Sequence, residues 1–316
     1  MLYVTTRDSQ NPYTPLHALT KERGECGGFY IPLRLPAVGD EVLNAFSARS
    51  FGQRIADILN IFFRTELNGR EISLAIGRLP TRIAVMNHKI AIMENWHNPD
   101  GDYSNFLVQL YGCTMKKAIV PELPSTWFRV TARIACLFAA FADLERVDIT
   151  TQYNTVDIAL TENCVEDVVA AIYAKKMGLP VGKIVLACSE DGGLWDLLHY
   201  GALETEKALA LSGLEMAVFE ILGHLEARRF ADACNRREIY RLREEQMLQL
   251  NKVLFCTVVR PSRVTSIIHN VYHTNAYLMD SVTASAYGGL QDYRASHKET
   301  DPALIISDRM PSGVIR

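Results

Sequence analysis

The sequence lacks the long charged or apolar runs that would commit a protein to nucleic acid or to a membrane. It contains 33 basic and 36 acidic residues, with a formal net charge of −3 and no long block of lysine or arginine. Nucleic-acid binding therefore has no electrostatic support. The most apolar helical stretch, residues 134–141, is too short and too closely flanked by charge to span a bilayer. We expect a protein that binds neither nucleic acid nor membrane.

Paired cysteine motifs, metal-ligand clusters and a signal segment are also missing. The seven cysteines are odd in number, contain no Cys-x-x-Cys, and predict reduced, mostly buried thiols, which favours a cytoplasmic location. No basic-then-apolar stretch opens the chain. His269 and His273 share one helical face, but no glutamate follows the first histidine and no third ligand is evident. We expect no metal site.

What the chain does contain is enough apolar sequence for one large core or two modest ones, since 48% of its 316 residues are hydrophobic. Residues 1–84 are typical of a small α/β domain. Strands are predicted at 2–6 and 29–31. Ser50 is placed to cap one helix, and residues 69–77 predict a second.

Residues 85–316 predict a larger α/β domain. The strand at 155–160, the helix at 165–177 and the strand at 184–188 form the βαβ pattern of a parallel sheet. The other elements that we expect are a hairpin at 83–86 and 89–93, strands at 254–259 and 303–307, helices starting near 104 and at 127–144, 192–201, 264–272 and 282–293, and a helical pair at 214–250.

The segment Trp96–Phe106 carries the most specific pattern of the chain. It resembles the stretch of threonine synthases that reads Phe-His-Gly-Pro-Thr-Leu-Ala-Phe-Lys-Asp-Phe, in which the lysine holds pyridoxal phosphate as a Schiff base. His97, Pro99 and Tyr103 fall in register, whereas Ser104 occupies the lysine position and Asn105 the position after it. A serine hydroxyl cannot form the imine that anchors the cofactor.

Further segments resemble the same family in the family's order. They are Met1–Arg7, Gly27–Pro32, Ile90–Glu94, Tyr173–Pro180 and Tyr277–Ala284. The resemblance implies the tryptophan-synthase-β-like pyridoxal phosphate fold of type II, an α/β fold with a parallel-sheet large domain and a small N-terminal domain. It also implies the conversion of O-phosphohomoserine to threonine and phosphate.

The family's small lobe has little room in this chain. In threonine synthases the lysine helix leads into an inserted small domain, after which the chain returns to the large domain. Here only Cys113–Pro124 separates the Phe106–Gln109 helix from Ser125–Arg129, which resembles the start of the return helix. A dozen residues cannot hold a domain. We therefore predict that the small cofactor lobe is missing.

The other cofactor positions also depart from the family pattern. The phosphate cradle, Gly-Asn-Phe-Gly in the family, is replaced by Asn163, Cys164, Val165 and Glu166. Carboxylate and phosphate charges about 4 Å apart repel by roughly 4 kcal/mol at an effective dielectric constant near 20, so Glu166 argues against an anion there. Asp308 stands where the family bonds the pyridine nitrogen.

These departures predict a truncated threonine synthase-like protein with no catalytic residue and no bound cofactor. It would act as a binding or interaction module, with a homo-oligomer or protein partner covering an exposed wall that includes Trp96, His97 and Tyr103. Two alternatives stay open. One is an active pyridoxal phosphate-dependent carbon–oxygen lyase that uses another lysine, and the other is a sensor of a small metabolite.

Overall fold

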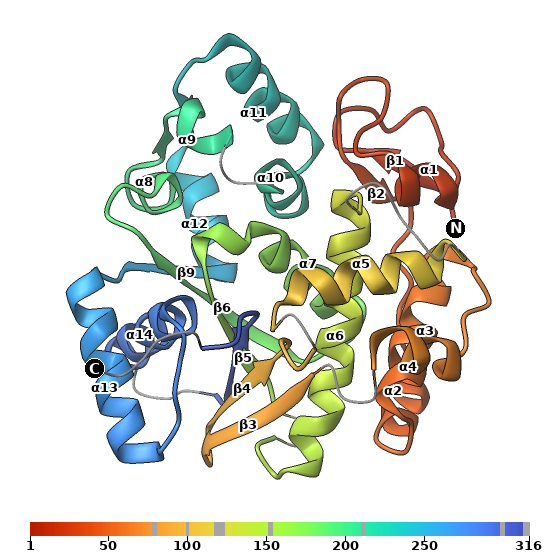
Figure 1. The fold of residues 1–316 in the computed structure, drawn as a ribbon. Helices are drawn as coiled ribbons and strands as arrows, with labels where there is room; N and C mark the ends of the chain where they lie inside the picture. Colours follow the sequence, from red (N-terminus) through yellow and green to blue (C-terminus); the bar gives the residue numbers. More distant parts are fainter. Residues whose placement is uncertain are drawn as a thin grey trace.

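A computed structural model describes residues 1–77, 81–98, 101–116, 124–150, 154–209, 213–297 and 301–311. Within these ranges a six-stranded sheet with the order β3-β4-β10-β5-β6-β9 forms the centre (Figure 1). Its strands are β3 (Arg82–Asn87), β4 (Ile90–Glu94), β5 (Val156–Thr161), β6 (Val181–Cys188), β9 (Leu254–Val258) and β10 (Ala303–Ser307). β3 and β4 form an antiparallel hairpin, and the strands from β4 to β9 are parallel.

The N-terminal part combines a two-stranded sheet with four helices. They are β1 (Tyr3–Thr5), β2 (Tyr30–Pro32), α1 (Pro15–Thr20), α2 (Asp40–Phe46), α3 (Phe51–Phe63) and α4 (Gly69–Ile76). Ser50 caps α3 by accepting from the Gln53 N–H at 3.3 Å, and Asn68 forms a capping box with Glu71 at the start of α4. A Cβ on Gly69 would lie 2.6 Å from the Gln53 nitrogen, so glycine permits the close approach of α4 to α3.

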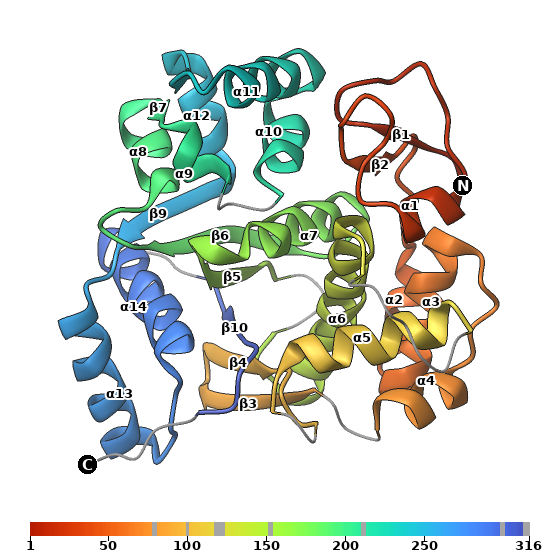
Figure 2. The same ribbon diagram turned by 45° about the horizontal axis from the view of Figure 1, so that its top comes forward.

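Helices cover both faces of the central sheet (Figure 2). The helices after the hairpin are α5 (Tyr103–Thr114), α6 (Thr126–Arg146), α7 (Val165–Lys176), α8 (Gly193–Tyr200), α9 (Thr205–Leu209), α10 (Leu214–Leu222), α11 (His224–Arg236), α12 (Glu244–Val253), α13 (Pro261–Asn275) and α14 (Ser281–Ser296). The short strands β7 (Ala202–Leu203) and β8 (Tyr240–Arg241) pair beside α8 and α11. α14 packs on β5, β6, β9 and β10, while α6 and α7 lie against the opposite face.

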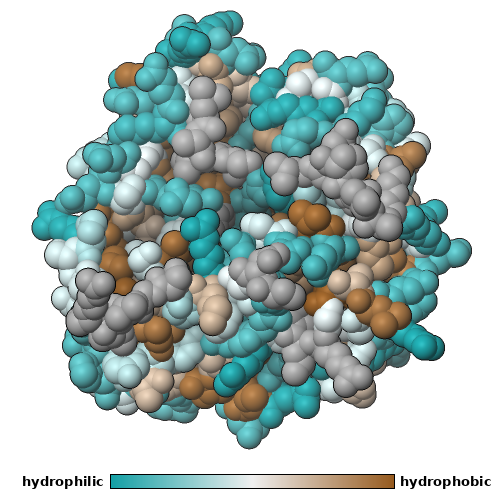
Figure 3. Space-filling view, in the orientation of Figure 1, coloured by the Kyte–Doolittle hydropathy of each residue, from teal (hydrophilic) through white to brown (hydrophobic). Residues whose placement is uncertain are grey.

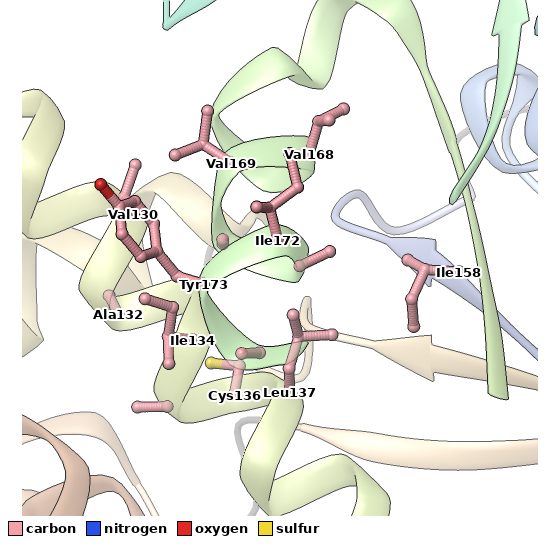
Figure 4. Close-up of a cluster of buried hydrophobic side chains, with 14 of the residues drawn as sticks. Val130, Ala132, Ile134, Cys136, Leu137, Ile158, Val168, Val169, Ile172 and Tyr173 are labelled. Atoms are coloured by element: carbon pink, nitrogen blue, oxygen red, sulfur yellow. The ribbon is translucent and has the colours of Figure 1, made fainter. Parts of the chain in front are cut away.

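Helix α6 is the centre of the larger apolar core. It is buried along most of its length because it packs against α3 on one side and α7 on another. Figure 4 shows its residues Ile134 and Leu137 beside Ile172 and Tyr173 of α7. An almost wholly apolar helix is expected where a helix is enclosed on all sides. This burial makes any charged side chain on α6 conspicuous.

The predicted α/β class, the hairpin and the βαβ unit are confirmed. The helical pair expected at 214–250 is wrong in detail, because Gly223 and β8 divide this range into the three helices α10, α11 and α12. The sequence pattern did not predict helices α1 and α2, because each spans only a few residues. No helix in the described part of the chain is long and apolar enough to cross a membrane.

Candidate functional site

The carboxyl ends of the parallel strands bring together the residues that the sequence singles out. β4 ends at Glu94, β5 at Thr161 and β10 at Ser307, all on one edge of the sheet. Helix α5 begins at the same edge, where the Tyr103 N–H donates to the Asp308 carbonyl at 2.9 Å. Open parallel sheets bind their ligands outside this edge. The candidate site therefore lies between the ends of β4, β5 and β10.

Ser104 lies in the first turn of α5. Asp102 caps the helix by accepting from the Ser104 N–H at 2.7 Å, and this cap sets the position of the first turn. Ser104 is exposed, and Asn105 beside it is half-buried. An exposed hydroxyl thus stands at the position where the family carries its lysine amine.

A buried arginine from α6 joins the elements around the site. The Arg133 Nε donates to Asp167 Oδ1 of α7 at 2.7 Å, and its Nη2 donates to Asp308 Oδ2 after β10 at 2.5 Å. The guanidinium carbon lies 3.8 Å from the centre of the Tyr103 ring of α5. Arg133 is only 1% exposed, so this cation sits in a nearly dry setting between two carboxylates and an aromatic face. We call these four side chains the Arg133 cluster.

Burial and charge shape the proton equilibria of this cluster. Burial raises the pKa of Asp167 to about 6, although the neighbouring Arg133 charge opposes that rise. Burial also raises the pKa of the Tyr103 hydroxyl. Burial opposes the charge on Arg133, but the carboxylates of Asp167 and Asp308 prevail and raise its pKa. Arg133 therefore stays charged, and Asp167 is the group that titrates nearest to neutral pH.

The positions of the phosphate cradle span the end of a short 3₁₀ turn, η1 (Glu162–Cys164), and the first two residues of α7. Asn163 is exposed, and Val165 is buried. Glu166 is not the unpaired anion that the sequence suggested. Arg129 of α6 holds both its carboxylate oxygens, with Nε and Nη2 each at 2.7 Å. The repulsion estimate for this position was wrong because a partner far away in the sequence neutralises the carboxylate.

A second polar group lies at the end of β4. The buried Glu94 carboxylate bonds His97 Nε2 at 2.7 Å and accepts from the Tyr277 hydroxyl at 2.6 Å. Burial, then the hydrogen bond to Glu94, raises the pKa of Tyr277. The Trp96 indole N–H donates to Ser307 Oγ at 3.2 Å, so His97 and Trp96 are both tied to the sheet edge.

Two features of the expected exposed wall need correction. Tyr103 is only 7% exposed, because its ring lies beneath Arg133 and stacks on Phe106. Trp96 and His97 are half-buried and stack on each other. Figure 3 shows apolar side chains in several separate patches on its face of the molecule. Pro99 and residues 117–123 of the predicted connection lie outside the described residues.

Comparison with known proteins agrees with this geometry. A family described as threonine synthase N terminus matches residues 2–78. The human protein threonine synthase-like 1 is 25% identical over 203 residues, which are 59% of this chain and 26% of the human protein. Its mouse counterpart is 28% identical over 174 residues, covering 52% of this chain and 22% of that protein. The chain thus matches about a quarter of the length of these curated relatives.

Solved structures of threonine synthases match nearly the whole chain. Pyridoxal phosphate-bound threonine synthase from Brucella melitensis has a TM-score of 0.80, with 16% identity over 98% of this chain and 89% of that one. Yeast threonine synthase has a TM-score of 0.79, with 16% identity over 98% and 87% of the two chains. The chain therefore shares the fold of these threonine synthases. Its fold is that of the type II pyridoxal phosphate enzymes, as expected.

The expectation of no cofactor is wrong for this fold, because the Brucella melitensis neighbour is a pyridoxal phosphate-bound enzyme. The residues of this chain fit that cofactor only in part. Asp308 is a carboxylate of the kind that can bond a pyridine nitrogen. Ser104 offers no amine for a Schiff base, and Glu166 already pairs with Arg129. The residue at position 104 therefore cannot attach pyridoxal phosphate covalently as a Schiff base.

Sequence reasoning missed Arg129 and Arg133, which organise the site. The available signal was their position one turn apart in the largely apolar first half of α6, since a buried arginine requires partners. The sequence could not identify those partners, because they lie on α7 and after β10. His269 and His273 are exposed on α13, and no group of three potential metal ligands occurs among the described residues.

Proposed function

We propose that this chain is a threonine synthase-like protein that does not carry out the threonine synthase reaction and that serves as a binding or interaction module. The observation that carries the proposal is the Arg133 cluster. Arg133 lies on α6, and its partners lie on α5, on α7 and directly after β10, the segments that carry Ser104, Glu166 and Asp308. The buried Arg133 thus links the segments that carry the cofactor positions of the family. Position 104 offers no amine for a Schiff base.

The organisation that we propose has an N-terminal domain at residues 1–84 and a large domain at 85–316 without the inserted lobe. The support is the short distance along the chain from the end of α5 at Thr114 to the start of α6 at Thr126. A connection of this length is too short for a domain.

An activity assay tests the absence of catalysis. Purified protein is incubated with O-phosphohomoserine and added pyridoxal phosphate, with yeast threonine synthase as the positive control, and threonine and phosphate are measured. We expect no product above the protein-free blank. Product formed by the unaltered chain would contradict the proposal and favour an active lyase that uses a lysine elsewhere.

The Ser104→Lys variant sharpens this assay. We expect it to stay inactive, because Arg133 still bridges Asp167 and Asp308. Turnover restored by this single change would mean that the missing amine alone explains the inactivity, and that the Arg133 cluster has no part in it.

Light scattering over a range of concentrations tests the interaction role. The part of the expected wall that stays partly accessible is the stacked pair Trp96 and His97, which supports a contact there. We expect a mass above that of one chain. A strict monomer at all concentrations would argue against self-association.

A further inference from the structure

Two cysteines at the edge of the central sheet lie closer together than non-bonded atoms of their size. Cys188 ends β6 and Cys256 lies in β9, and their sulfur atoms are 2.7 Å apart. Non-bonded carbon atoms prefer about 3.5–4.0 Å, and sulfur is larger. A disulfide bond is about 2.05 Å long. The two thiols are therefore in direct contact.

The surroundings of the pair restrict which reagents can reach it. Both thiols are buried, at 3% and 7% exposure, so large reagents are excluded. β9 is the outermost strand of the described sheet and pairs there with β6. The register sets Cys188 opposite Val258 and Cys256 opposite Leu186, so the sulfur atoms meet along a diagonal.

A buried carboxylate completes the group. Glu162 is 4% exposed, and its Oε1 accepts from the N–H and the hydroxyl of Ser189. Its Oε2 has no hydrogen-bond partner among the described residues. The hydrogen bond to Cys256, then burial and the nearby Glu162 charge, raise the pKa of the Cys188 thiol. Cys188 thus rests as a thiol, and it can attack a peroxide only when a base takes its proton.

We propose that Cys188 and Cys256 form a reversible disulfide when the protein meets hydrogen peroxide, with Glu162 as the proton acceptor. Glu162 takes the Cys188 proton while the sulfur attacks one peroxide oxygen. The O–O bond breaks, and the leaving hydroxide takes a proton to become water. Cys256 then attacks the resulting sulfenic acid, the S–O bond breaks, and a second water leaves. Two thiols are oxidised, and one peroxide is reduced to two waters.

The disulfide would join β6 to β9 and close the chain segment that contains α8 to α12. A crosslink of this kind mainly restricts the unfolded chain, so the oxidised protein should resist unfolding. The disulfide would therefore stiffen one side of the candidate site. It includes no residue of the Arg133 cluster.

Peptide mapping tests the proposal on the unaltered, folded protein. After peroxide treatment of the folded protein and removal of excess peroxide, the protein is denatured, free thiols are blocked with N-ethylmaleimide, and the chain is cut with trypsin without reduction. Each cysteine lies alone in its expected peptide, at 184–207 and 253–263. We expect these two peptides to be linked, with the link lost in dithiothreitol and the melting temperature raised by roughly 5 °C while it persists.

Matched variants separate this site from general thiol oxidation. Cys136→Ala removes another buried cysteine and should leave the link intact. Cys188→Ala should abolish the link and the rise in melting temperature. Glu162→Gln should slow linkage by at least about tenfold, because the proton acceptor is lost. Recovery of both thiols as maleimide adducts from treated, folded protein would overturn the proposal, as would a link between any other pair of cysteines.

Discussion

Replacing Arg133 by methionine tests the central cluster most directly. The change removes the buried cation but keeps most of the side-chain volume. Asp167 and Asp308 then face each other without their shared partner, and Tyr103 loses the guanidinium above its ring. Breaking a buried ion pair from one side costs about 3–5 kcal/mol. We expect a fall of this size in the free energy of unfolding at pH 7.

The pH dependence distinguishes this loss from ordinary packing damage. In the unaltered chain Asp167 has a folded-state pKa of about 6, above its usual value near 3.9. The folded state thus binds a proton that the unfolded state releases, so the contribution of this group to stability declines as the pH rises toward 6. Without Arg133 the folded-state pKa rises further, because the opposing charge is gone. The variant should keep losing stability above pH 6, by up to about 1.4 kcal/mol per pH unit relative to the unaltered chain.

Urea unfolding followed by tryptophan fluorescence at pH 5 to 8 measures both effects. Arg260→Met is the control, because Arg260 and Glu190 form an exposed pair with side chains 72% and 56% accessible. Its cost should stay below about 1 kcal/mol. The reasoning about the Arg133 cluster would be refuted by a loss no larger than that of the control. Parallel stability curves for the variant and the unaltered chain above pH 6 would refute the linkage argument.

Two further predictions concern the framework around the site. Asn68→Ala removes the capping box of α4 and should lower stability by about 1 kcal/mol in urea unfolding, whereas Asn68→Ser should keep most of the cap; equal losses would contradict the capping account. Glu215→Gln weakens the contact of α10 with Thr6 and with Arg7, whose nitrogens lie 3.0 and 2.7 Å from the carboxylate oxygens. It should lower the melting temperature by several degrees, from a loss of about 2 kcal/mol, while the exposed Glu204→Gln should change it little.

The local pattern of the sequence determined most of the elements and their order. Alternation and helical spacing are properties of neighbouring residues, so the hairpin of β3 and β4, the β5–α7–β6 unit and the capped start of α3 could be predicted. The same holds for the resemblance to threonine synthases, since Ser104 stands inside a contiguous motif. Its identity alone settles that this position has no amine.

Only the tertiary structure decided the charges of the candidate site. Glu166 looks like an unpaired anion in the sequence because Arg129 lies 37 residues away, and Asp308 meets Arg133 across 175 residues. The closeness of Cys188 and Cys256 likewise depends on β6 and β9 becoming neighbours in the sheet. Electrostatic and covalent chemistry depends on distances between atoms, and periodicity along the chain carries no information about distances between segments far apart in it. The sequence therefore identified the side chains, whereas the packing of α6 and the order of the strands determined which of them interact.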